Sequence, residues 1–243
     1  MSPSSPSSSS PHRVNGTKPH TVDQISGNCS LAIKQTFLNP GMVFATLDRD
    51  GKYRALGFAM ETVFQTIIVT HISHSDAPAH WETSWKKPDS MVSQATEKNS
   101  TNQVPAQSGQ SVESVTLICE VDVSPDMANN HHLLHGGCTA FLVDMCSSLS
   151  VVALTMMRRS IKSPSPAVQN HPAQFDMLSQ SMNVVYHSPS QVGDRLRIVS
   201  TTMPMRELVS NVCVQTEIWS TTQHRLVASG VQNMMKMSSG SRL

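Results

Sequence analysis

The chain has 243 residues, and its 18 Lys and Arg residues nearly balance its 17 Asp and Glu residues, so the formal net charge is +1. Without a basic run, the sequence argues against a nucleic-acid-binding protein, in which positive charge gathers on one face. Its five cysteines are odd in number and lack CxxC spacing, which favours small core residues in a reducing compartment over disulfides.

Three stretches precede the part with regular patterns. Residues 1–24 are Ser- and Pro-rich and predict a disordered leader without the apolar region of a secretory signal. Residues 25–69 form a segment in which we expect short helices at 25–37 and 53–65. Residues 70–111 are polar, without apolar periodicity, and predict a disordered insertion. A further hypothesis is that splicing should remove this insertion, which sequencing of the transcript would decide.

Alternation of apolar and polar residues marks a strand at 112–123 (VESVTLICEVDV). Period two over this length predicts a strand with one buried face. The residues expected on that face are Val115, Leu117, Cys119, Val121 and Val123.

The segment 136–157 (GGCTAFLVDMCSSLSVVALTMM) is apolar or small on every side and contains no proline. Its length favours a helix of about five turns over a strand. Since a helix that is apolar all round is usually buried, we expect it inside the domain. Arg158 and Arg159 follow it, where cations suit the negative end of the helix dipole. No window reaches the roughly eighteen uninterrupted apolar residues of a membrane span, so none is predicted.

Four further strand-like runs cover 178–187, 194–203, 207–220 and 225–236, separated by turn residues. One strand, one buried helix and four strands predict an α+β domain over 112–237. In it, an antiparallel sheet of about five strands wraps around one long central helix.

Asp144 is the only charged residue in the predicted helix. Burying an unpaired carboxylate costs several kcal/mol, so a function for Asp144 is favoured over a cap of a neighbouring loop. The helix opens with Gly136-Gly137, although glycines are poor helix formers. Lacking side chains, they let a ligand approach the N–H donors at the positive end of the dipole, where an oxyanion would be stabilised. The alternative is tight packing of the helix against the sheet.

Eight positions separate Gly136 from Asp144, which is about 12 Å along one helix axis. Both cannot touch one carbonyl carbon. If both act on one substrate, they must come from different subunits, and a two-fold axis would bring each Asp144 near the partner's Gly136. We therefore expect a homodimer.

His135-Gly136-Gly137, with Asn129 before it and Asp144 after it, resembles the signature of the PaaI-type hotdog-fold thioesterases. The block LSQSMNVVYHSPSQVGD at 178–194 adds to the resemblance, which runs from about residue 114 to 237. It implies a hotdog fold and hydrolysis of an acyl-CoA to a free acid and coenzyme A. Coenzyme A would belong to the substrate, so no cofactor and no metal are expected. We expect the homodimer to assemble further as a dimer of dimers, and the sequence leaves the choice between dimer and tetramer open.

The resemblance also assigns roles to five residues. Asp144 would activate water or attack the thioester, and the Gly136 N–H would contact the oxyanion. Asn129 and His135 would orient the carbonyl or the water, and Ser179 would assist from a facing strand. The sequence departs from the family at position 181, where Ser181 replaces a frequent acidic residue, and in a longer, Pro-rich loop at 157–177.

Other polar residues carry weaker predictions. His131, His132 and His135 lack companion ligands at zinc spacing, so no metal site is expected. Cys138 is expected to be a packing residue and not a nucleophile. Arginines could bind the phosphates of coenzyme A or be solvated charges on strands; the candidates are Arg195, Arg197 and Arg206.

Two alternatives to hydrolysis in general metabolism remain open. One is an acyl-CoA-binding hotdog protein without catalysis, and the other is a thioesterase that releases an intermediate of a specialised biosynthetic pathway. A hotdog hydratase is disfavoured, since no His follows Asp144 at the spacing of hydratase motifs. The final Ser241-Arg242-Leu243 is a variant of the peroxisomal address, so we expect a peroxisomal import receptor as a partner, and otherwise a cytoplasmic location.

Overall fold

A computed structural model of the chain describes residues 20–47, 50–54, 57–75, 112–162, 176–203 and 211–237. Most of the predicted leader, residues 76–111 of the predicted insertion, and the tail 238–243 with its Ser241-Arg242-Leu243 motif lie outside the described residues. The predictions made for them stay predictions.

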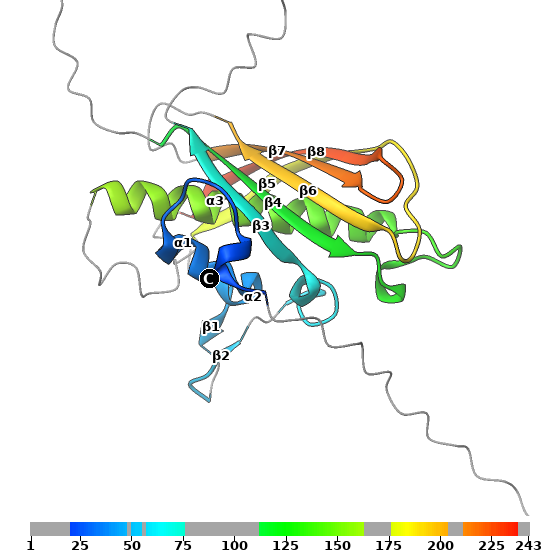
Figure 1. The fold of residues 1–243 in the computed structure, drawn as a ribbon, viewed down its shortest axis with the longest axis horizontal. Helices are drawn as coiled ribbons and strands as arrows, with labels where there is room; N and C mark the ends of the chain where they lie inside the picture. The colour runs from blue at the N-terminus through cyan, green and yellow to red at the C-terminus, as the bar shows by residue number, and fades with distance from the viewer. Residues whose placement is uncertain are drawn as a thin grey trace, which may run out of the picture.

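The described residues form a six-stranded antiparallel sheet around one long helix, α3 (Gly136–Lys162) (Figure 1). The strand order is β3-β4-β6-β7-β8-β5, so β3 and β5 are the two edges. The strand bounds are β3 (Ile68–Ser75), β4 (Ser114–Asp122), β5 (Met177–Tyr186), β6 (Arg195–Thr202), β7 (Asn211–Ser220) and β8 (Arg225–Lys236).

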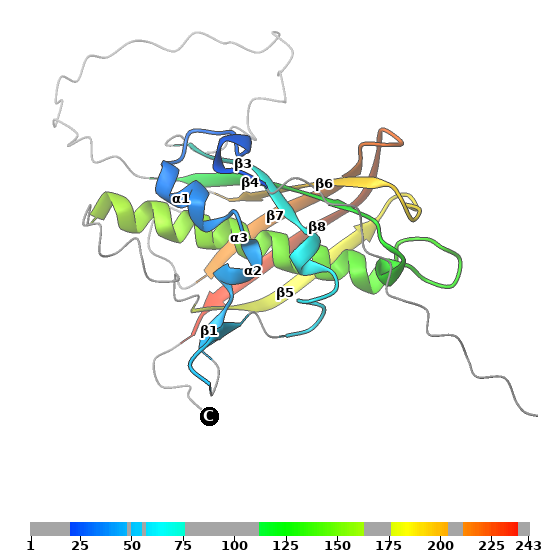
Figure 2. The same ribbon diagram turned by 60° about the horizontal axis from the view of Figure 1, so that its bottom comes forward.

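In Figure 2, β4 and β6 pass on one side of α3 and β5 on the other, so the sheet curves around the helix. This arrangement confirms the predicted α+β hotdog fold, with one strand more than the five expected. We call the sheet face toward α3 the inner face and the opposite one the outer face.

The predicted alternation in β4 is confirmed, because its apolar residues are buried against the core while Asp122 is exposed. The inner-facing residues Val115, Leu117, Cys119, Val121 and Val123 are all at most 2% exposed. β6 and β8 follow the same rule and lie within one residue of their predicted bounds, as does β5. β7 begins at Asn211, and residues 204–210 lie outside the described part.

The central helix extends further than predicted, to Lys162 instead of Met157. Arg158 therefore lies within the helix, where its Nε donates a 3.0 Å hydrogen bond to the Val112 carbonyl. By length and hydropathy, Gly136–Ser160 could also cross a membrane, but 72% of its apolar window is buried inside the protein. This burial is what the core helix of a globular domain requires.

The N-terminal segment differs most from its prediction. Its helices are short: α1 (Leu31–Thr36) and α2 (Pro40–Val43). The helix expected at 53–65 is wrong, since Tyr53–Arg54 forms β2, paired with β1 (Thr46–Leu47), and only a 3-10 turn, η2, follows at Phe64–Thr66. Two further 3-10 turns are η1 (Val22–Gln24) and η4 (Pro125–Met127).

Strand β3 lies partly in the stretch that was expected to be a polar insertion, so the boundary at residue 70 is wrong. Val69 and Ile72 are fully buried. An irregularity in the pairing with β4 between Val69 and His71 breaks the period-two pattern of apolar residues. For this reason the strand was not predicted from the sequence. The preceding segment packs on α3 through aromatic residues, with the Phe64 and Phe141 ring centroids 6.4 Å apart.

Candidate functional site

Asp144 lies on α3 where the helix passes beneath β5 and β8. Its Oδ1 accepts a 2.8 Å hydrogen bond from the Ser179 hydroxyl of β5. In the single chain Asp144 is half-buried and Ser179 is exposed, so the carboxylate can be reached from outside. The structure thus brings together two of the residues singled out in the sequence.

Two residues that the sequence did not single out complete this cluster. The Gln232 amide nitrogen donates to Asp144 Oδ1 and, at 2.7 Å, to Ser179 Oγ. The Gln232 carbonyl accepts from the Ser147 hydroxyl. A glutamine in a strand reads as a surface residue, and no sequence signal places it over a helix 88 positions away.

A β-bulge in β5 directs Ser179 toward Asp144. Ser179 pairs with Met234 and Ser181 with Asn233, so the register shifts between the two serines. Ser179 therefore lies on the inner face, whereas Ser181 accepts a 3.0 Å hydrogen bond from Asn233 Nδ2 on the outer face. The departure at position 181 consequently lies away from the carboxylate.

The start of α3 is capped by His135, whose Nδ1 accepts a 2.9 Å hydrogen bond from the Gly137 N–H. Nδ1 then carries a lone pair, and the neutral ring has its proton on Nε2. The N–H of Thr139 donates to the His135 carbonyl at 2.9 Å. Among the described residues, none accepts a hydrogen bond from the Gly136 N–H, so this donor is available to a ligand.

Packing within the chain does not require glycine at position 136. A Cβ there would lie 3.6 Å from the nearest atom of Tyr186, which is ordinary van der Waals contact. At Gly137 a Cβ would lie 3.1 Å from His135 Nδ1, which is tight. The packing alternative therefore applies to Gly137, whereas the absence of a side chain at Gly136 leaves room for a group from outside the chain.

A cavity of about 350 Å³ opens beside Gly136. Tyr186 forms one wall and donates a 3.1 Å hydrogen bond to the Gly136 carbonyl. The remaining lining comes from the loop before α3, from α3 itself, from the turn after β5 and from β8: Leu134, Thr139, His187, Ser188, Pro189, Ser190 and Val227. Asp144 does not line this cavity, in agreement with the separation of the two groups along one helix.

Asn129 belongs to the loop that leads into α3. Its Oδ1 accepts hydrogen bonds from the N–H groups of His131, at 2.9 Å, and Leu133, at 3.2 Å. This side chain therefore shapes the loop before the helix start. Within the described part of one chain, the recorded contacts of Asn129 and His135 are with this loop and helix start and not with Asp144.

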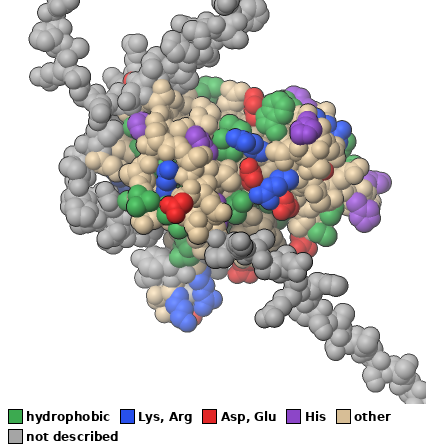
Figure 3. All heavy atoms as spheres, in the orientation of Figure 1, with side chains coloured by type: hydrophobic (Ala, Val, Ile, Leu, Met, Phe, Trp, Pro, Cys, Tyr) green, Lys and Arg blue, Asp and Glu red, His purple; other side chains and the backbone are tan. Residues whose placement is uncertain are grey.

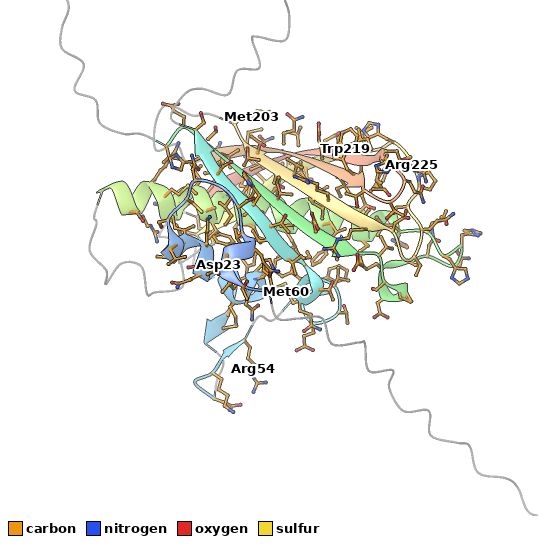
Figure 4. All side chains as sticks on the ribbon, in the orientation of Figure 1. Asp23, Arg54, Met60, Met203, Trp219 and Arg225 are labelled. Carbon is orange, nitrogen blue, oxygen red and sulfur yellow. The ribbon has the colours of Figure 1, made fainter. Side chains whose placement is uncertain are left out.

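The turn after β5 is held by Asp194, which is 5% exposed. Burial alone would raise its pKa. Hydrogen bonds from Gln191, Ser190 and Gln223 and the nearby charge of Arg225 outweigh burial and hold the pKa below its usual value. Arg225 also donates to the Pro189 carbonyl in the cavity wall. In Figure 4 it lies at the end of the molecule where α3 begins.

The three arginines proposed for coenzyme A have different surroundings. Arg195 is ion-paired with Glu120 at 2.9 Å and Asp122 at 3.0 Å, so its charge is already partnered. Arg197 is exposed on β6, and Arg206 lies outside the described residues. Figure 3 shows Lys and Arg side chains interspersed with Asp and Glu side chains over much of the face that it presents.

Cys138 is half-buried in the first turn of α3, and burial raises its pKa to about 11. Since the thiolate is the nucleophilic form, a protonated thiol is a poor nucleophile near neutral pH. Within the described ranges, no three His, Cys, Asp or Glu side chains gather as they would around a metal ion.

Comparison with known proteins finds a curated relative and solved structures to which this chain is similar. The mouse protein acyl-coenzyme A thioesterase 13 is 31% identical over 114 residues, which cover 47% of this chain and 68% of that protein. Zebra fish thioesterase superfamily member 2 is 22% identical, with a TM-score of 0.38, over 50% of this chain and 75% of that one. A hypothetical thioesterase of Streptococcus pneumoniae TIGR4, solved with coenzyme A, is 16% identical, with a TM-score of 0.40, over 51% and 79%. No family model matches the chain.

Proposed function

This chain belongs to the PaaI-type hotdog thioesterase family of acyl-coenzyme A thioesterase 13, and on that premise we propose that it hydrolyses acyl-CoA thioesters to a free acid and coenzyme A. The observation that carries the proposal is the Asp144–Ser179 hydrogen bond beside an accessible carboxylate. A relative solved with coenzyme A and another solved with acetyl-CoA support this class of substrate.

In the proposed reaction, Asp144 takes a proton from a water molecule as the water oxygen attacks the thioester carbonyl carbon. The carbonyl oxygen becomes an oxyanion. The carbon–sulfur bond then breaks, the acid leaves, and the proton on Asp144 passes to the departing thiolate. Direct attack by Asp144 is the alternative route. In a single turnover in ¹⁸O-water, ¹⁸O in the Asp144 carboxylate would show direct attack, because an anhydride that water opens at the Asp144 carboxyl carbon leaves the label there, whereas general-base catalysis places the label only in the released acid.

The Gly136 N–H would stabilise the oxyanion, since it sits at the positive end of the α3 dipole with no side chain in front of it. The adjacent cavity of about 350 Å³ would receive the thioester. His135 Nε2–H and Asn129 would orient the carbonyl or the water from the same helix start.

Asp144 and the Gly136 N–H lie too far apart along one helix to act on the same thioester, so the proposed site requires a second subunit. Strand β5 offers the surface for it. β5 is a sheet edge, and along one side its backbone groups have no partner strand within the part of the chain that the structure describes. Met182 and Tyr186 pair with the buried residues Gln232 and Ala228, so they lie on the inner face, yet they are 40% and 58% exposed. A copy pairing antiparallel along β5 would cover them and bring the partner's helix start toward Asp144.

A second apolar surface supports the expected dimer of dimers. On the outer face of β5 and β8, four large apolar side chains are 38–49% exposed: Leu178, Val185, Val231 and Met235. In the register of β5 and β8 these side chains lie in two groups, Leu178 with Met235 and Val185 near Val231, with the Ser181–Asn233 pair between them. Burial of this exposed apolar surface would favour association.

The direct test is the release of free thiol from a panel of acyl-CoAs. Asp144→Asn should lower kcat by roughly a thousandfold, as expected for loss of a general base. The matched control is Asp23→Asn, which neutralises an exposed carboxylate on the N-terminal segment, labelled in Figure 4, and should leave kcat unchanged.

Two results would contradict the proposal. Tight acyl-CoA binding without thiol release would favour the non-catalytic binding protein. Turnover unchanged by Asp144→Asn would remove Asp144 from the mechanism. Preference for one class of acyl group within the panel would decide whether the enzyme serves a specialised pathway.

A further inference from the structure

Gln232 is the polar exception in a row of apolar and small residues. On β8, the inner-facing residues at alternate positions are Ala228, Gly230, Gln232 and Met234, and Gln232 is 0% exposed. Burying an amide costs free energy unless both its donor and acceptor groups are paired. A side chain of methionine size would fill the same place without that requirement, so the amide needs an explanation.

The hydrogen bonds of Gln232 converge on one oxygen of Asp144. The amide nitrogen donates to Asp144 Oδ1 and to Ser179 Oγ, and Ser179 donates to the same Oδ1. One carboxylate oxygen thus receives two donors. In the described residues, no donor is recorded for Oδ2.

The Asp144 carboxylate fixes which way the amide points, because it can only accept hydrogen bonds. The buried Ser147 hydroxyl, one turn beyond Asp144 on α3, lies within hydrogen-bond distance of both the Gln232 carbonyl oxygen and the Asp144 backbone carbonyl, and either can accept its proton. In the reversed orientation, the Gln232 carbonyl oxygen would face Asp144 Oδ1, and two acceptors would repel each other. The nitrogen is therefore held toward the carboxylate.

We propose that Gln232 is a positioning residue that acts through Asp144: with Ser179 it holds Oδ1, which leaves Oδ2 as the oxygen that receives the proton from water. This inference rests on the proposed function. It explains the buried amide and assigns different tasks to the two carboxylate oxygens. Ser147 supports the arrangement from the neighbouring turn of the helix.

The test replaces Gln232 with methionine, which keeps the volume of the side chain but removes both donors. We expect kcat to fall by about ten- to a hundredfold, as misplacement of a reacting group does, while KM and the thermal midpoint stay near the wild-type values. Ser147→Ala, which removes the hydroxyl beside the amide carbonyl but leaves the amide nitrogen on Asp144, should give a smaller loss of kcat. Gln215→Met changes an exposed glutamine on the outer face of β7 and should have no effect.

An unchanged kcat in Gln232→Met would overturn the inference, and so would a loss of activity that merely follows a loss of folded protein. A wild-type protein that releases no thiol would instead refute the proposed function. In that case, crystal structures of the wild type and of Gln232→Met still decide the inference. It predicts one Asp144 orientation in the wild type and a rotated or multiple one in the variant, and an identical orientation in both would contradict it.

Discussion

Ser179 on β5 donates a 2.8 Å hydrogen bond to Asp144 on α3, 35 positions earlier in the chain. The contact joins the central helix to an edge strand most of whose residues are exposed. Because Ser179 is exposed in the single chain, the pair faces the region that a second subunit would occupy.

Ser179→Ala removes one of the two donors to Asp144 Oδ1. We expect kcat to fall by about tenfold or more, because the carboxylate loses part of its orientation. Steady-state thiol release measures the change. The matched control is Ser181→Ala, which alters a serine two positions away that bonds Asn233 on the opposite face. If the two variants lose activity equally, the bulge does not separate their roles.

Gly230→Ala should destabilise the fold where β8 crosses α3. A Cβ at this position would lie 2.7 Å from Val143 Cγ1 and 3.2 Å from the Asn183 carbonyl oxygen. Such overpacking costs about 1–3 kcal/mol of the free energy of unfolding, which chemical denaturation measures.

The variant to compare with Gly230→Ala is Gly136→Ala, because a Cβ at position 136 would meet Tyr186 at an ordinary van der Waals distance. This variant should keep the stability of the wild type while losing activity, because its methyl group would lie where the thioester approaches. Equal destabilisation by the two substitutions would show that Gly136 is a packing residue after all.

The depressed pKa of Asp194 predicts a pH dependence of stability. Its ionised form is favoured in the folded state, so it stabilises the protein above the usual aspartate pKa of about 3.9, and this stabilisation is lost as pH falls through the lower folded-state value. Asp194→Asn should therefore be less stable than the wild type at pH 7, and the gap should narrow as the pH falls below the usual aspartate pKa of about 3.9. Urea titrations across this range measure it, and a gap independent of pH would contradict the assignment.

The elements that can be predicted from the sequence are those in which the pattern of apolar residues indicates which side is buried. In β4, every second residue is apolar, and α3 is apolar on all sides, so both elements could be assigned before any contact was known. Strand β3 could not, since an irregularity between Val69 and His71 interrupts its alternation and His71 and Ser73 make it look polar.

The same distinction applies to the site. Asp144 stands out as a charge in an apolar helix, and Gly136 stands out as a poor helix former at a helix start. Ser179 is an ordinary strand serine that only the family resemblance singles out. Gln232 has no local signal, because its role arises from tertiary hydrogen bonds between β8, β5 and α3.

The central claim is that Asp144 of one subunit acts with Gly136 of the other, and a mixed dimer tests it most directly. Asp144→Asn removes the carboxylate. Gly136→Pro removes the N–H donor at the first helical position, where proline is well tolerated. Each homodimer should be inactive and should melt near the wild-type temperature.

The measurement is thiol release by a heterodimer of these two variants, purified through two different affinity tags. It contains one site with both groups intact and one site with neither, so we predict about half the activity of the wild-type dimer. A heterodimer as inactive as its two parents would contradict the shared site.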